Sequence, residues 1–129
     1  MTLKALPNTS LSSGELKLYA FDEAEHTIGC VELFNYDPLN QRAAVGIVVA
    51  TPLRNLGHGT AMLKELTHFC RNNTSLHQLY ADIASLNQPS IRIFQHAGYQ
   101  LCGTFRQWVI KDGQYFDTHR YQLLLDETH

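Results

Sequence analysis

The sequence has few cysteines, no long apolar run and little net charge. Its 129 residues include only three cysteines, Cys30, Cys70 and Cys102. They are far apart and have apolar neighbours, which predicts reduced core residues of a cytoplasmic protein and no disulfide framework. No apolar run is long enough to span a membrane, and no signal-peptide core is present at the N-terminus. The formal net charge of −2 gives no indication of a nucleic-acid or anionic-membrane partner.

Metal-ligand spacing is also missing. The seven histidines show no regular ligand pattern, and His68 and Cys70 lie two residues apart in a predicted helix, where they point to different faces. We therefore expect no metal site. The hydrophobic fraction of 44% and charged fraction of 17% are those of a globular domain large enough for one core.

The most informative segment that is present joins a buried strand to a glycine-rich helix start. Residues 45–49 form a β-branched apolar run, which predicts a strand that is buried on both faces. From Thr60 onward the apolar positions change to helical spacing. The predicted apolar stripe comprises Met62, Leu63, Leu66, Phe69 and Cys70.

Between these two elements lies the sequence Arg54-Asn55-Leu56-Gly57-His58-Gly59. A helix start exposes unpaired backbone N–H groups and the positive end of the helix dipole, and glycines allow an anion to approach them. This arrangement predicts a phosphate or pyrophosphate site, to which Arg54 adds a charge-assisted contact. Alternatively, the glycines only permit a tight turn. A P-loop is excluded because Thr60-Ala61 follows Gly59, and Met62 stands where a dinucleotide fingerprint needs a small residue.

The pattern R-x-x-G-x-G-x-A from Arg54 to Ala61 is similar to the acetyl-CoA loop of the GNAT superfamily of N-acetyltransferases. A second segment, from Asn87 through Ser90 to Gly98-Tyr99, resembles the family's asparagine and glycine-aromatic motif. The similarity covers about residues 15–125, and residues 103–125 resemble the spermidine and ribosomal-protein acetyltransferase branch.

The resemblance and the local pattern predict an α+β fold with a mixed sheet, in the order β-β-β-α-β-α-β-β. We expect strands at 15–21, 27–34 and 76–83, with 1–14 as a loose leader and 15–126 as one domain. Asn87 is suited to cap the second helix, Gly98 suits its end, and Asp112-Gly113 favours a type I′ hairpin. The family's usual first strand and two helices are absent, so the fold is N-terminally shortened and its acceptor wall is missing. An exposed sheet edge and an uncovered apolar face then favour a homodimer or higher oligomer.

The resemblance also implies roles for individual residues, with acetyl-CoA as cosubstrate. Backbone groups of Ile47, Val48 and Val49 would pair with the pantetheine amides. The remaining cofactor contacts are expected from the loop and from the second helix: Arg54, Asn55, Leu56, Gly57, His58, Gly59, Thr60, Asn87, Ser90 and Phe94.

The sequence offers candidates for a general base but lacks the family's usual general acid. Asp82 is the candidate base, or alternatively a strand-end carboxylate in solvent or in a salt bridge, and Glu32 is the second candidate. The tyrosine that usually protonates the leaving thiolate is replaced by Phe94, while Tyr99 is expected to pack. Ser90 or water would then act as the acid, or the thiolate would leave unassisted.

These features lead to three possible functions. The first is acetyl-CoA-dependent transfer to a primary amine, such as a protein N-terminus, a polyamine or another small amine. The second is a degenerate acyl-CoA-binding or structural module without catalysis, which Phe94 and the short N-terminus favour. The third, an unrelated anion-binding α+β domain, requires the match from Asn87 to Tyr99 to be accidental.

Overall fold

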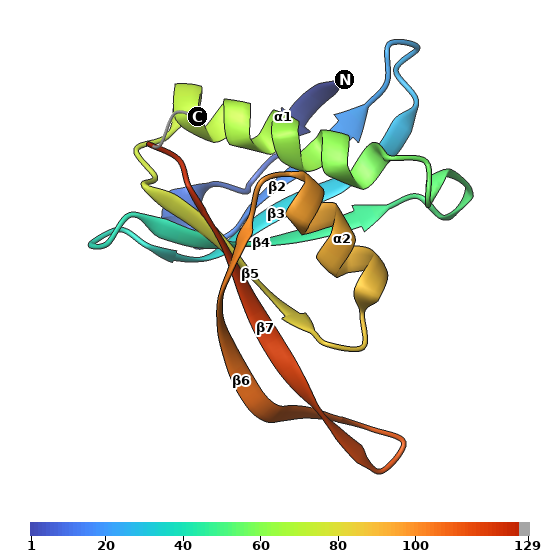
Figure 1. The fold of residues 1–129 in the computed structure, drawn as a ribbon. Helices are drawn as coiled ribbons and strands as arrows, with labels where there is room; N and C mark the ends of the chain where they lie inside the picture. Colours follow the sequence, from blue (N-terminus) through green and yellow to red (C-terminus); the bar gives the residue numbers. More distant parts are fainter. Residues whose placement is uncertain (127–129) are drawn as a thin grey trace.

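The computed structural model describes residues 1–126, apart from the side chain of Pro52, and forms a single sheet flanked by two helices (Figure 1). Along the chain the elements are β1 (Thr2–Ala5), the 3₁₀ turn η1 (Leu11–Ser13), β2 (Leu16–Phe21), β3 (Thr27–Asp37), β4 (Arg42–Val49), the 3₁₀ turn η2 (Thr51–Leu53), α1 (His58–Asn73), β5 (Gln78–Ala84), α2 (Gln88–His96), β6 (Gln100–Lys111) and β7 (Gln114–Leu124).

The seven strands lie in the order β1-β2-β3-β4-β5-β7-β6. Every neighbouring pair is antiparallel except β4 and β5, which run parallel and are joined through α1. The expected α+β fold with a mixed sheet is therefore confirmed. The strand–helix–strand unit is its only parallel crossover among the described residues.

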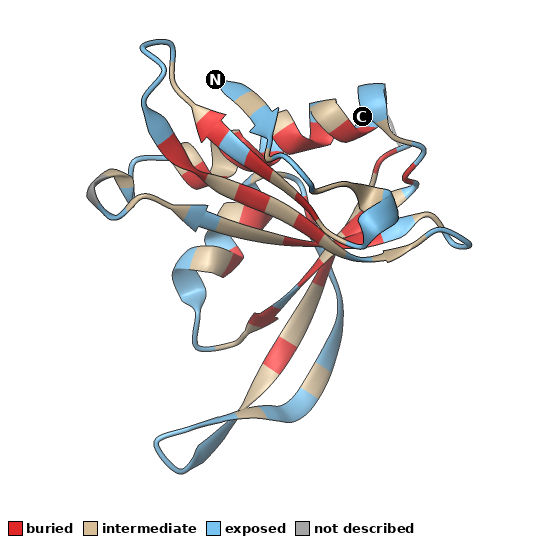
Figure 2. Cartoon of the chain, turned by 180° about the vertical axis from the view of Figure 1, so that it is seen from behind, coloured by how far each residue is buried: buried red, intermediate tan, exposed pale blue. Residues whose placement is uncertain are grey.

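Both helices cover the same face of the sheet. Four residues of the predicted apolar stripe of α1, Met62, Leu63, Leu66 and Cys70, are fully enclosed, and the fifth, Phe69, is half-buried. The stripe packs on inward-facing strand residues such as Leu18. In the view from behind, the strands lie in front of the helices (Figure 2), and no described element covers this second face, which we call the bare face.

The start of the chain differs from the expectation. Residues 1–14 are not a loose leader, because Thr2–Ala5 forms β1 and pairs with β2 from Phe21 to Leu18. Leu3 packs against the core, and Ser10 bridges to Glu15. The sequence signal was weak because a four-residue strand at a sheet edge has too few positions to show an alternating pattern.

The C-terminal elements agree with the predictions. Asp112 and Gly113 have φ values of 52° and 77°, as a two-residue type I′ hairpin requires. Gly98 follows α2 with φ of 96°. Together β6 and β7 extend beyond the other strands as a two-stranded ribbon (Figure 1), and β6 is an edge strand.

The cysteines are all free. Cys70 is buried and Cys30 is half-buried, but Cys102 is exposed on β6, so the expectation of three core cysteines is wrong for Cys102. Its apolar neighbours in the sequence lie on a ribbon that projects from the core and therefore do not enclose it.

Candidate functional site

The candidate site is a cleft where two parallel strands separate. β4 and β5 pair only from Arg42–Gln78 to Ala44–Tyr80, and both strands then continue without pairing to each other. A cleft of about 210 Å³ opens between them. Its lining residues come from β4, β5 and α2: Val45, Gly46, Ile47, Ala81, Asp82, Ile83, Ala84, Asn87, Ser90 and Phe94. Five residues named from the sequence (Ile47, Asp82, Asn87, Ser90 and Phe94) therefore meet in one place.

One edge of the cleft is the backbone of β4. The N–H of Ala50 donates to the carbonyl of Ile28 on β3 at 2.8 Å. Because backbone groups alternate in direction along an antiparallel strand, those of Val48 also point to β3, whereas those of Ile47 and Val49 point into the cleft. Of the three residues named for backbone pairing, Ile47 and Val49 are thus correctly oriented. The carbonyl of Val49 accepts a hydrogen bond from Arg54 Nε at 3.2 Å.

The helix start lies directly beyond this edge. Gly57 is the N-cap of α1 with φ of 84°, and Asn55 has φ of 65°, so the loop turns through two left-handed residues. No described side chain caps α1, which leaves the first-turn N–H groups available to an anion. Exposed Arg54 lies at the same turn.

Gly59 has a packing role in addition to its expected place in the loop. It is buried, and a Cβ there would lie 2.9 Å from Cδ1 of Ile93 on α2. The absent side chain therefore lets α1 and α2 approach each other. Thr60 Oγ1 also donates to the Ile93 carbonyl, at 3.5 Å. Gly57, by contrast, has no neighbour within 4 Å of the corresponding position in the described chain.

The wall opposite β4 is the start of α2. The Oδ1 of Asn87 accepts from the Ser90 N–H at 3.3 Å, so the predicted cap is confirmed, and its Nδ2 has no acceptor among the described residues. Phe94 is only 2% exposed and lies edge-on to Tyr99, with ring centroids 4.9 Å apart. Tyr99 is packed in the core, as the sequence indicated.

Asp82 lies on β5 and faces the bare side of the sheet. Both of its oxygens accept hydrogen bonds from Arg120 on β7, Nε at 2.8 Å and Nη2 at 2.9 Å. These bonds raise the pKa of Arg120. The guanidinium lies over the Tyr80 ring at 4.4 Å and is 5.4 Å from the Phe105 centroid. The sequence analysis missed Arg120, since its pairing with Asp82 depends on the register between β5 and β7.

Glu32 is the second carboxylate near the cleft. It lies on β3 opposite Gly46, which lines the cleft and has no side chain that would separate Glu32 from it. Partial burial, with a smaller contribution from Glu15, raises the pKa of Glu32. A carboxyl with a raised pKa is better matched to proton transfer near neutral pH than an ordinary surface carboxylate.

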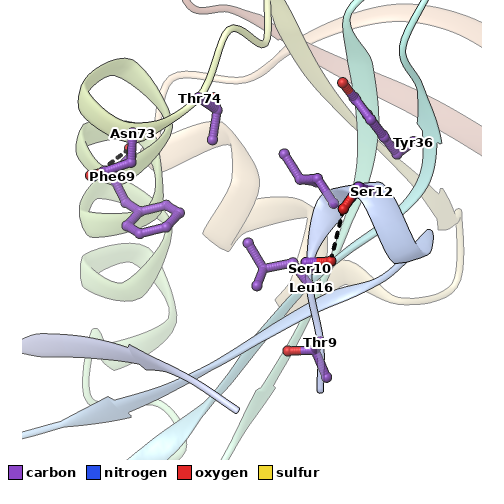
Figure 3. Close-up of a pocket in the computed structure, with 9 residues that line it drawn as sticks. Thr9, Ser10, Ser12, Leu16, Tyr36, Phe69, Asn73 and Thr74 are labelled. Carbon is purple, nitrogen blue, oxygen red and sulfur yellow. Dashed lines mark hydrogen bonds between the residues drawn. The ribbon is translucent and has the colours of Figure 1, made fainter. Parts of the chain in front are cut away.

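A second hollow of about 380 Å³ lies between α1 and the segment from Thr9 to Leu16 (Figure 3). Four of its polar side chains are already bonded locally: Thr9 Oγ1 donates to the Leu6 carbonyl, Thr74 Oγ1 to that of Cys70, and the hydroxyls of Ser10 and Ser12 are 3.1 Å apart. Its lining contains no carboxylate, histidine or cysteine. The cleft between β4 and β5 is therefore the stronger candidate site.

The described residues contain neither a metal-binding cluster nor a membrane-spanning helix. They hold no cluster of three or more histidine, cysteine or acidic side chains able to bind a metal ion. Within residues 1–126, neither helix has the length and apolar character needed to cross a bilayer.

Comparison with known proteins identifies a matching family model and several relatives. The family model described as Acetyltransferase (GNAT) domain matches residues 6–100. An uncharacterized N-acetyltransferase of Bacillus subtilis, the SPbeta prophage-derived YokL, is 24% identical over 107 residues, which cover 83% of this chain and 60% of YokL. The L-amino acid N-acetyltransferase AaaT of Escherichia coli is 25% identical over 77 residues, covering 60% of this chain and 48% of AaaT. The chain thus spans about half to three fifths of these curated relatives.

The fold is also shared with solved structures. The crystal structure of spermidine N-acetyltransferase from Vibrio cholerae in complex with CoA and spermine superposes with a TM-score of 0.80 at 20% identity. The alignment covers 88% of this chain and 68% of that one. At this identity the likeness establishes the common fold.

Proposed function

The chain belongs to the GNAT acetyltransferase family, and on this basis we propose that it transfers an acetyl group from acetyl-CoA to a primary amine. One observation carries the proposal: the cleft between β4 and β5 leads directly to an uncapped, glycine-containing helix start. A thioester needs a narrow slot beside free backbone groups, and a pyrophosphate needs exposed N–H groups with positive charge.

The cofactor would be held by groups along this path. Arg54, Gly57 and the first-turn N–H groups of α1 would bind the pyrophosphate, with Asn55, Leu56, His58, Gly59 and Thr60 shaping the loop. The backbone of Ile47 and Val49 and the free Nδ2 of Asn87 would pair with the pantetheine amides. Ser90 and Phe94 would line the thioester end of the cleft.

The reaction is a direct transfer. The neutral amine nitrogen attacks the thioester carbonyl carbon, and a C–N bond forms as the C–S bond breaks. The nitrogen loses one proton to the base and the released CoA thiolate takes up one proton, so the products are an amide and CoA. A cleft-facing N–H of Ile47 or Val49 would stabilise the developing oxyanion.

Proton removal would fall to a carboxylate at the cleft. Asp82 remains the proposed base. Its carboxylate has four lone-pair positions, of which the hydrogen bonds from Arg120 use two, and the other two are left for an incoming amine or water. Glu32 is the alternative because of its position opposite Gly46. Comparing the pH profiles of Asp82→Asn and Glu32→Gln distinguishes them: only loss of the base removes the acidic limb of kcat/KM.

We also propose self-association and a reducing, cytoplasmic location. The edge strand β6 and its ribbon expose large apolar side chains (Trp108 is 65% exposed and Ile110 61%), and such edges favour pairing with another strand. The three free cysteines suit a reducing compartment. A monomer mass by light scattering at micromolar concentration would count against association.

The activity is tested by incubating the folded chain with acetyl-CoA and a panel of primary amines and measuring free CoA. We expect release of CoA that depends on the amine. Acetyl-CoA binding without amine-dependent release would instead support the non-catalytic acyl-CoA-binding function that Phe94, in place of a tyrosine, makes possible.

A further inference from the structure

The bare face of the sheet carries an ordered pair of opposite charges beside the cleft. Asp82 and Arg120 are register partners on β5 and β7, and two parallel hydrogen bonds of 2.8 and 2.9 Å join them. Their side chains are 37% and 39% exposed, so a small molecule can reach both. Asp82 itself lines the cleft. The pair is therefore at the open end of the site, on the face opposite the helices.

Arg120 is held in place from three sides. Asp82 fixes one edge of the guanidinium, and the Tyr80 and Phe105 rings lie 4.4 and 5.4 Å from its central carbon. The contact with Tyr80 places the guanidinium over β5, next to Asp82, the cleft-lining residue that it binds. A planar cation fixed in this way loses little side-chain entropy when it binds a ligand.

The pair retains unused hydrogen-bonding capacity. Asp82 occupies Arg120 Nε and one N–H of Nη2, and the other three N–H groups have no acceptor among the described residues. Two lone-pair positions of the Asp82 carboxylate are also free. Donors that suit an anion thus lie next to acceptors that suit an ammonium or amine.

The remaining charges of the bare face are balanced. The described strands and their flanks place Lys4, Lys17, Arg42 and Arg120 there against Glu15, Glu32, Asp37 and Asp82. No excess negative charge is available to hold a polycation, and a polyamine on Asp82 would bring further positive charge against Arg120.

From these contacts we propose that the Asp82–Arg120 pair is the acceptor site and selects an amine that bears an adjacent carboxylate, namely a free α-amino acid. The inference rests on the proposed acetyl transfer. The amino nitrogen lies by Asp82 at the cleft, where it reaches the thioester, and the carboxylate binds the free N–H groups of Arg120. Arg120 acts as a specificity-determining residue and takes no part in the bond changes.

The test compares acceptors that differ only in the carboxylate. Wild-type protein is assayed with several L-amino acids, their amides, the decarboxylated amines and spermidine, with acetyl-CoA affinity measured by calorimetry in parallel. We expect kcat/KM for the best amino acid to exceed that for its amide by about ten- to a hundredfold, the effect of a charge-assisted hydrogen-bond pair.

Variants then separate recognition from structure. Arg120→Gln should retain acetyl-CoA affinity and should lower kcat/KM for the amino acid about ten- to a hundredfold more than kcat/KM for its amide, because only the amino acid loses its carboxylate contact. Arg120→Lys keeps a charge beside Asp82 but loses the planar fork, so it should recover only part of the amino-acid activity.

Preference of the wild type for spermidine or amides overturns the inference but leaves acetyl transfer intact. An equal loss for every acceptor in Arg120→Gln also overturns it, because the pair would then have only a structural role. A folded chain that binds no acetyl-CoA overturns the proposed function and this inference together.

Discussion

Replacing Gly59 by alanine tests what this glycine does. The added Cβ would lie 2.9 Å from Cδ1 of Ile93, 3.2 Å from Cγ2 and 3.4 Å from Cγ1, so the Ile93 side chain must move by several tenths of an ångström. Overpacking of this kind costs about 1–3 kcal/mol, and alanine returns up to about 1 kcal/mol of helix propensity. We therefore expect a net destabilisation of about 1 kcal/mol, measured by urea unfolding.

The reasoning has a specific control. Ile93→Val removes Cδ1, the nearest atom, so the double variant Gly59→Ala/Ile93→Val should recover about 0.5–1 kcal/mol relative to additivity. Gly103→Ala has no described neighbour within 4 Å and serves as a glycine control without crowding. The reasoning is refuted if Gly59→Ala unfolds like the wild type while acetyl-CoA affinity collapses, because the glycine would then serve the cofactor and not the helix contact.

Three other changes have clear expected outcomes. Tyr99 is buried and its hydroxyl has no partner among the described residues, so Tyr99→Phe should raise stability by about 1 kcal/mol in thermal unfolding, and a loss of that size would show a hidden bond. Phe94→Tyr places a hydroxyl at the cleft and should keep acetyl-CoA affinity while raising turnover by up to about 10²-fold; a large loss of binding would place Phe94 away from the thioester. Burial raises the pKa of Glu32, so its stabilising contribution is present at low pH and is lost as pH rises through the folded-state pKa. Glu32→Gln should therefore be more stable than the wild type at pH 7, with a difference that shrinks toward pH 4, whereas a pH-independent difference would contradict this.

Local sequence patterns were enough to predict the buried face of α1, the cap of α2 and the hairpin between β6 and β7. The spacing from Met62 to Cys70 gave the buried face of α1, Asn87 gave the cap of α2, and Asp112-Gly113 gave the hairpin. Each depends on residues within one or two turns of the chain, where periodicity and backbone preference dominate. The same holds for the glycine-rich helix start.

Features set by tertiary contact were not predictable in this way. The pairing of Asp82 with Arg120 spans 38 residues and requires the β5–β7 register, which no local pattern fixes. The packing role of Gly59 depends on Ile93, 34 positions later, and β1 depends on its pairing with β2 and on the packing of Leu3 against the core. Exposure of Cys102 follows from the ribbon's departure from the core.

The most direct test of the cofactor site is calorimetric titration of the folded chain with acetyl-CoA, with NAD as a control ligand. We predict saturable binding of acetyl-CoA but not of NAD, weakened in Arg54→Ala because exposed Arg54 lies at the uncapped start of α1 and its Nε bonds the Val49 carbonyl at the cleft edge. Absence of acetyl-CoA binding by a folded sample, or equal affinity in Arg54→Ala, would contradict the account.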